Sequence, residues 1–209
     1  MYTSISHVSR VVLGRQAKPV TFHSDFVLLG EPLALDLVNT RVCRSGELVD
    51  LLDTTQALGA WLRAERPRLA WTGKATAADL RAVRALRATI DELLRALRER
   101  VQPVPSAVAA INRAFSRRHP SPQLTWAASG PRLTISPSGT QCDRLLQLLA
   151  TDAVQLMTGR RAARIRECAH PGCRLQFLAI NPRRRWCSGT LCGNRARVAR
   201  HYLKQHRAT

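Results

Sequence analysis

The stretch that decides the fold of the C-terminal part contains four regularly spaced cysteines: Cys168-x4-Cys173-x13-Cys187-x4-Cys192. Each close pair can supply two thiolates from one tight turn, and two such pairs can enclose a single tetrahedral Zn2+. Pro171-Gly172 allows the chain to reverse within the first pair, and Ser188-Gly189 does so within the second. We therefore predict one structural zinc held by these four cysteines.

Two other interpretations of the cysteines are open. The four thiols could form two disulfides, but the N-terminus shows no secretory signal, and disulfides are rare in a reducing compartment. His170 lies inside the first turn and could replace a cysteine as a ligand. Four thiolates with a nearby histidine is the simpler account.

The net charge of the chain is concentrated around these cysteines. The 209 residues carry 33 Lys plus Arg against 14 Asp plus Glu, a formal charge of +19. Residues 160–209 hold thirteen of the cations and one acid, a net +12 in under a quarter of the chain. An excess of this size favours a polyanionic partner such as nucleic acid.

The segment after Cys192 predicts a basic helix. Arg197, Arg200, Lys204 and Arg207 follow one another at three- and four-residue steps, which places them in one stripe. The apolar residues of the segment lie on another side: Val198, Ala199, Tyr202 and Leu203. A helix of this kind fits the major groove of duplex DNA.

We assign the DNA contacts by position. Residues at the start of the helix can reach base edges, and the remaining cations can hold phosphates. The predicted base contacts are Asn194, Arg195 and Arg197. The predicted phosphate contacts are Arg183, Arg184, Arg185, Arg200, Lys204 and Arg207. A solvated positive surface is the alternative for each arginine.

The preceding part of the chain predicts an α+β fold that is mainly helical. The clearest helix begins near Thr76, and its apolar residues recur at three- and four-residue steps as far as Leu97. Other helices are expected over 33–40, after a cap at Thr54 or Thr55, over 106–117 and after a cap at Ser138 or Thr140, with 46–53 as a connector. Residues 124–126 and 133–135 flank Ser129-Gly130-Pro131 and predict a β-hairpin.

We divide the chain into three parts: a flexible extension over 1–20, a helical domain over 21–159 and a zinc finger over 160–209, joined at Gly159-Arg160-Arg161. No run of eighteen apolar residues occurs, so no transmembrane helix is expected. With no secretory signal either, the sequence predicts a soluble, cytoplasmic protein.

The helical domain contains one polar cluster at the end of an apolar helix: Asp36, Asn39, Thr40 and Arg41. These residues could cap the helix, or they could form a pocket for a small-molecule effector. The domain shows no glycine-rich phosphate loop, no HExxH and no Gly-x-Ser-x-Gly. We therefore predict that the protein is not an enzyme.

RNA binding is the alternative to DNA binding. Proteins that read single strands usually offer exposed aromatic side chains for base stacking. The finger segment offers Phe177, Trp186 and Tyr202, and we expect all three in the core of the small module. An enzyme with a structural zinc ranks third, since four protein ligands leave the metal no open position.

The C-terminal motif resembles the CGNR zinc-finger family, which is named for the Cys-Gly-Asn-Arg found here at Cys192 to Arg195. The N-terminal part resembles the usual companion of that finger, the ABATE domain, whose marker reads Leu-Asp-Phe-Val-Asn-Thr. This chain has Leu35-Asp36-Leu37-Val38-Asn39-Thr40, with leucine in place of the aromatic residue. The two resemblances cover about residues 22–207.

The resemblance implies a bacterial transcription regulator, proposed to act in stress responses, whose finger binds double-stranded DNA. It also implies that Cys168, Cys173, Cys187 and Cys192 are the zinc ligands, and that Asn194 and Arg195 belong to the family signature. A ligand-sensing role for the ABATE part is an expectation of the same kind.

Overall fold

The computed structural model describes residues 21–23, 26–116, 121–136 and 139–206. The predicted flexible extension over 1–20 lies outside these residues. The elements of the helical part are β1 (Thr21–His23), β2 (Phe26–Leu28), α1 (Leu33–Val38), β3 (Arg41–Arg44), β4 (Glu47–Asp50), α2 (Thr55–Ala64), α3 (Ala77–Glu99), α4 (Pro105–Phe115), β5 (Ser121–Ala127), β6 (Gly130–Ser136) and α5 (Gln141–Thr158). The finger part contains a 3-10 helix (Ala162–Arg164), β7 (Ile165–Glu167), β8 (Gln176–Leu178) and α6 (Cys192–Gln205).

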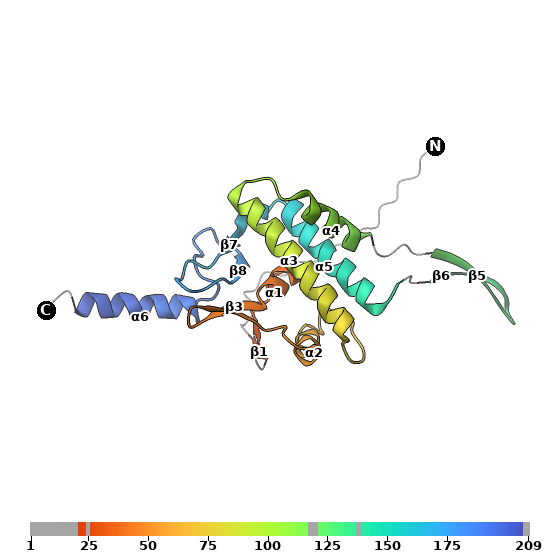
Figure 1. Cartoon of the computed structure of the whole chain (residues 1–209), viewed down its shortest axis with the longest axis horizontal. Helices are drawn as coiled ribbons and strands as arrows, with labels where there is room; N and C mark the ends of the chain where they lie inside the picture. The colour runs from red at the N-terminus through yellow and green to blue at the C-terminus, as the bar shows by residue number, and fades with distance from the viewer. Residues whose placement is uncertain (1–20, 24–25, 117–120, 137–138, 207–209) are drawn as a thin grey trace.

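Three helices, α3, α4 and α5, form the body of the protein and pack side by side (Figure 1). Helix α3 begins with a capping box, in which the Thr76 hydroxyl accepts from the Asp79 amide and the Asp79 carboxylate accepts from the Thr76 amide. The predicted apolar stripe of α3 is buried from Leu80 to Leu94, whereas Leu97 is exposed at the end of the helix. The mainly helical class is therefore confirmed.

Helix α1 is short and lies between the body and the finger (Figure 1). All six of its residues are buried, as is typical of a helix that is apolar on nearly every side. Its first turn receives a tertiary cap, because the carboxylate of Asp152 on α5 accepts from the Ala34 amide at 2.8 Å. This contact joins the first turn of α1 to α5.

The described strands pair only as antiparallel hairpins: β1 with β2, β3 with β4, β5 with β6, and β7 with β8. The hairpin predicted around Gly130 is confirmed as β5–β6. The prediction of a connector over 46–53 is wrong, since β4 occupies 47–50. Ser45 and Gly46 both have positive φ, the conformation that a two-residue hairpin turn requires.

The finger shares its core with the helical part. Ile165, Leu175, Phe177 and Leu178 are buried in the same cluster as the side chains of α1, α3 and α5. Gly159 follows the last residue of α5, so the predicted joint falls between two elements. The division into separate domains stays a prediction. None of the helices within the described residues is long and apolar enough to cross a membrane.

The capping box of α3 can be tested with a matched pair of threonines. Replacing Thr76 by Ala removes the cap and should lower the free energy of unfolding by ~1 kcal/mol. Replacing Thr89 by Ala should leave stability unchanged or slightly higher, because Thr89 lies mid-helix and its exposed hydroxyl only donates to the Ala85 carbonyl. Urea unfolding measures the free energy of unfolding of both variants. An equal loss of stability in the two variants would contradict the role of the cap.

Candidate metal centre and nucleic-acid interface

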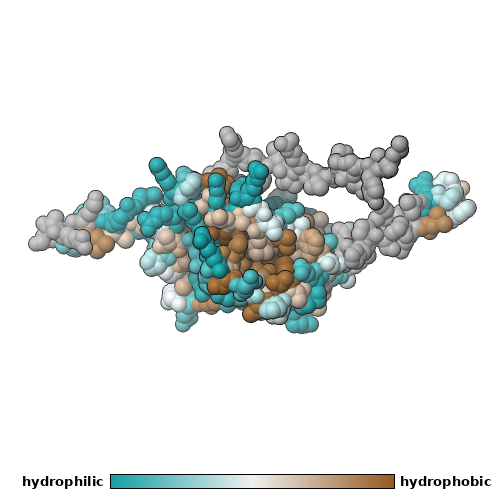
Figure 2. Space-filling view, turned by 90° about the horizontal axis from the view of Figure 1, so that it is seen from above, coloured by the Kyte–Doolittle hydropathy of each residue, from teal (hydrophilic) through white to brown (hydrophobic). Residues whose placement is uncertain are grey.

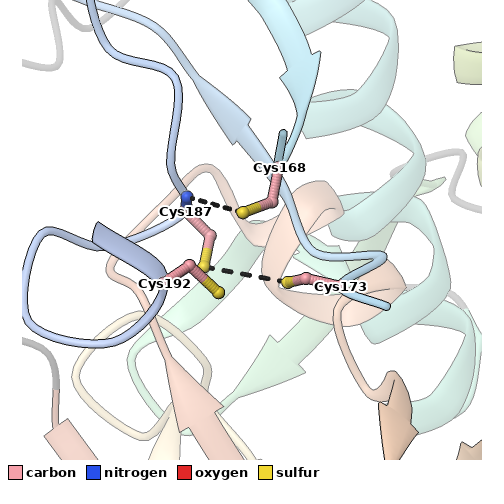
Figure 3. Close-up of side chains that lie close together, drawn as sticks. All are labelled: Cys168, Cys173, Cys187 and Cys192. Carbon is pink, nitrogen blue, oxygen red and sulfur yellow. Dashed lines mark hydrogen bonds between the residues drawn. The ribbon is translucent and has the colours of Figure 1, made fainter. Parts of the chain in front are cut away.

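The four cysteines of the finger come together at one point (Figure 3). Cys168 follows β7, Cys187 precedes a tight turn, and Cys192 begins α6. Cys173 closes the first turn by donating its amide to the His170 carbonyl at 3.0 Å, and Gly172 provides the positive φ that this turn needs. All four Sγ atoms lie within 4.8 Å of one another.

This arrangement fits a tetrahedral Zn2+. Zinc–sulfur bonds of about 2.3 Å place the sulfur atoms of such a site about 3.8 Å apart. The Sγ atoms of Cys173 and Cys187 are 3.9 Å apart. A disulfide would require about 2.05 Å, and all four cysteines are free. Three of them are buried and Cys173 is half-buried, so the cluster is largely shielded from water.

The sulfur atoms interact strongly with one another. The hydrogen bond from Cys187 lowers the pKa of Cys173 to about 5. The same bond, together with burial, raises the pKa of Cys187 well above its ordinary value. Burial is the main cause that raises the pKa of Cys192 to about 12. The protonation of each of these three thiols therefore depends on its neighbours.

The glycine of the Cys-Gly-Asn-Arg motif allows the helix to begin beside the cluster. A Cβ at Gly193 would lie 3.3 Å from the Ser188 carbonyl oxygen and 3.4 Å from Cδ1 of Trp186, which is tighter than most side-chain contacts. The Gly193 amide also donates to that carbonyl at 2.9 Å. Gly193 is therefore required by close packing at the start of α6.

Helix α6 extends away from the body (Figure 1). The described side chains from Asn194 to His206 are exposed, apart from the half-buried Ala196. These include four of the predicted DNA contacts: Asn194, Arg195, Arg197 and Arg200. Lys204 lies in α6 although its side chain is not described, and Arg207 lies outside the described residues. The helix thus presents Arg195, Arg197 and Arg200 to solvent.

The three arginines before Cys187 differ in their surroundings. Arg183 is exposed, and the guanidinium of Arg185 lies 5.4 Å from the centre of the Trp186 ring. Arg184 points into the protein, where it pairs with Glu31 at 2.8 Å and lies 4.2 Å from the centre of the Phe177 ring. The predicted phosphate contact of Arg184 would compete with these internal partners.

The expectation that all three finger aromatics are core residues is only partly correct. Phe177 is fully buried and Trp186 is half-buried, but Tyr202 is 59% exposed. Val198 and Leu203 are exposed as well. Helical spacing predicted a shared apolar side for these residues, but periodicity does not indicate whether another element covers that side.

The polar cluster that follows α1 makes a contact with the finger. The Asn39 side-chain amide donates to the Gln176 carbonyl at 2.9 Å, and its oxygen accepts from the Gln176 amide at 2.7 Å. Asn39 and Gln176 are both buried. The asparagine thus satisfies both backbone groups of a residue in β8, as a neighbouring strand would.

The other members of the cluster have separate partners. The Asp36 carboxylate accepts from Arg68 at 2.5 Å, and burial raises the pKa of Asp36 to about 7 against the opposing charge of that arginine. The Thr40 hydroxyl accepts from Arg87 at 2.8 Å. Arg41 begins β3 and lines a shallow polar hollow. Effector binding by these four residues stays a prediction.

Sequence reasoning missed several residues that hold the finger in place. The Glu31 carboxylate accepts from the Leu178 amide at 3.0 Å, in addition to its ion pair with Arg184. Arg98 of α3 donates to the side chains of Gln176 and Glu167, each at 2.6 Å. The local sequence around Glu31 does not indicate that this acidic side chain is buried.

We refer to the hydrogen bonds from the side chains of Asn39 and Glu31 to β8 as the finger contact.

A mainly helical region followed by a four-cysteine finger defines the class, a zinc-finger protein with an additional helical part. Comparison with known families identifies both parts. The model of the family ABATE, described as "Putative stress-induced transcription regulator", matches residues 31–160, and the model of the CGNR zinc finger matches residues 164–205. The chain belongs to the ABATE family and carries a CGNR zinc finger, which confirms the resemblance found in its sequence. Neither description is that of an enzyme.

Comparison with proteins of curated function gives no match.

The metal centre can be tested by replacing a single cysteine. Wild-type protein should contain about one equivalent of zinc, and Cys187→Ser should lose it, because three thiolates hold the metal less tightly. Cys43→Ser is the matched control, since Cys43 lies in β3 outside the cluster. Metal analysis and thermal unfolding should show lost zinc and a lower melting temperature for Cys187→Ser alone. Absence of zinc from the wild type would contradict the assignment.

The finger contact can be tested at Asn39. Asn39→Ala leaves the buried amide and carbonyl of Gln176 without partners, which should lower the free energy of unfolding by about 1–3 kcal/mol. Asn112→Ala is the control, because Asn112 is an exposed residue of α4. Urea denaturation measures both variants. Unchanged stability of Asn39→Ala would show that the contact contributes nothing and would favour a role in effector binding alone.

Proposed function

We propose that this protein is a DNA-binding transcription regulator whose CGNR finger presents α6 to the major groove. The observation that carries this proposal is the exposure of α6, a basic helix that begins at the fourth cysteine and extends from the body (Figure 1). Its 14 residues span about 21 Å, long enough to cross a groove about 12 Å wide.

One structural Zn2+ held by Cys168, Cys173, Cys187 and Cys192 supports the helix in this proposal. When bound, the metal would fix the two cysteine turns and the first residue of α6, and its closed set of four ligands leaves it no catalytic position. Four thiolates and Zn2+ reduce the charge of residues 160–209 from +12 to about +10. Thiolate ligation also agrees with a reducing, cytoplasmic location.

The charged residues divide into two groups by position. Asn194, Arg195 and Arg197 lie in the first turns of α6, where side chains can reach base edges. The residues proposed to hold phosphates are Arg183, Arg185, Arg200, Lys204 and Arg207. Arg184 instead supports the fold, because its guanidinium already pairs with Glu31 and stacks on Phe177.

The finger contact gives the ABATE part a role in this function. Asn39 and Glu31 fix β8, and the cysteine turns on either side of β8 fix the start of α6. The orientation of the helix toward DNA is therefore set by the body of the protein. An effector bound beside Asp36, Asn39, Thr40 and Arg41 would act on the finger through the same bonds.

RNA binding is a second candidate, favoured by one observation. Tyr202 is 59% exposed, and its ring stacks on His206 with the two ring centroids 6.5 Å apart. An exposed aromatic ring next to a basic helix can stack on an unpaired base. Competition between a DNA duplex and a single-stranded RNA of equal length distinguishes DNA binding from RNA binding. Tighter binding of the duplex supports the DNA-binding proposal, and tighter binding of the RNA overturns it.

The basic helix can be tested by its salt dependence. If about five phosphates are neutralised, log K should fall with log salt at a slope near −4 to −5. The triple variant Arg197→Ala, Arg200→Ala, Lys204→Ala should flatten the slope by roughly two to three units and weaken binding to all duplexes. Fluorescence anisotropy with a labelled duplex measures both quantities.

A control with the same loss of charge makes this test specific. Arg63→Ala, Arg66→Ala, Arg81→Ala removes three exposed arginines from the helical part and should change the slope little. Asn194→Ala should reduce discrimination between duplex sequences more than it reduces the slope, because it carries no charge. Unchanged affinity of the α6 triple variant at matched salt would show that DNA binds elsewhere.

A further inference from the structure

The β5–β6 hairpin has one apolar and one polar face. Its register pairs Leu124 with Leu133, Trp126 with Pro131 and Pro122 with Ile135. Residues opposed in an antiparallel ladder lie on the same face, so these six apolar positions share a face. The opposite face takes the intervening positions, which are mostly polar: Ser121, Gln123, Thr125, Arg132, Thr134 and Ser136.

The apolar face is open to solvent where its side chains are described. Leu124 is 69% exposed and Trp126 is 76% exposed. In Figure 1 the hairpin extends from the body on the side opposite α6. A two-stranded hairpin is at best marginally stable in water, and strict alternation is typical of a sheet with one buried face. The sequence of this hairpin is therefore that of a sheet packed against another surface.

The body of the same chain offers a complementary surface. Val108 and Phe115 of α4 and the preceding N-cap residue Val104 are spaced to fall on one side of the helix, and each is at least 41% exposed. Leu148 of the adjoining α5 is exposed as well, and its neighbour Gln147 donates to the Phe115 carbonyl. Seen from above, the body of the protein has hydrophobic surface near its centre (Figure 2).

We propose that a second copy of this chain covers both surfaces. The apolar face of each hairpin packs on the α4–α5 surface of the other copy, and a two-fold axis relates the two contacts. Such a reciprocal exchange closes after two subunits, since each copy both donates and receives one hairpin. It buries on the order of 1,000 Å² in total, the lower bound for a stable interface.

The charge distribution limits where a second copy can bind. The chain carries a formal +19, so two copies repel each other over most of their surface. Residues 120–142 contain a single charged side chain, Arg132, and the register places it on the polar face. The hairpin is therefore a region where two copies of this basic chain can approach. Pairing there also leaves both α6 helices at the outside of the dimer, clear of the contact (Figure 1).

Sedimentation equilibrium of the full zinc-loaded chain tests the proposal. The wild type should form a dimer, and Trp126→Ala should raise its dissociation constant at least tenfold, as expected for a central aromatic side chain. Val108→Asp should do the same from the opposite surface. Thr125→Ala is the matched control on the polar face and should leave the dissociation constant unchanged. Melting temperatures measured at low concentration establish that each variant is folded.

Mixing the two weakened variants distinguishes packing of the hairpin on α4–α5 from pairing of one hairpin with the other. A pair of Trp126→Ala and Val108→Asp chains contains one intact hairpin-to-helix contact, so an equimolar mixture should dimerise more than either variant alone. No gain on mixing would indicate hairpin-to-hairpin pairing and overturn the arrangement. A wild type that stays monomeric overturns the proposal altogether. If, in such a monomer, acrylamide does not quench the fluorescence of Trp126, the side chain is shielded from solvent. The hairpin then packs on the body of its own chain.

Discussion

The buried backbone groups on the outer edge of β8 need hydrogen-bond partners. The attachment of the finger to the helical part depends on the side chains that supply them. A strand of a two-stranded sheet directs alternate amides and carbonyls away from its partner. In β8 these groups belong to Gln176 and Leu178, which are buried. The side chains of Asn39 and Glu31 supply the missing partners. A short polar segment after α1 thus replaces a third strand and fixes the finger on the helical part.

This constraint explains the organisation of the finger. A segment of about fifty residues that is rich in arginine has little apolar surface of its own to bury. The finger compensates by placing Phe177 in the common core and by gathering four cysteines beside it. Gly193 then allows α6 to start against the second cysteine turn. The rest of α6 is free of the body, so its side chains are available to a partner.

The sequence predicted what depends on local pattern. The helices follow from apolar periodicity and from capping residues such as Thr140, and the metal site follows from the spacing of four cysteines. The partner of Asn39 lies 137 residues further along the chain, and no local pattern can indicate such a contact. The exposure of Tyr202 was missed for a related reason, because amphipathic spacing does not show whether a covering element exists. Arg184 was grouped with two surface arginines, although its surroundings are decided by Glu31 and Phe177.

The rigid attachment of the finger is the central claim, and amide hydrogen exchange of the native full-length protein tests it most directly. The amides of Gln176 and Leu178 are buried and bonded to side chains of the helical part. They should therefore exchange as slowly as the core amides of α3, such as Ile90 and Leu94. Rapid exchange at Gln176 and Leu178, while α3 remains protected, would show that the finger separates from the body, and would contradict the account.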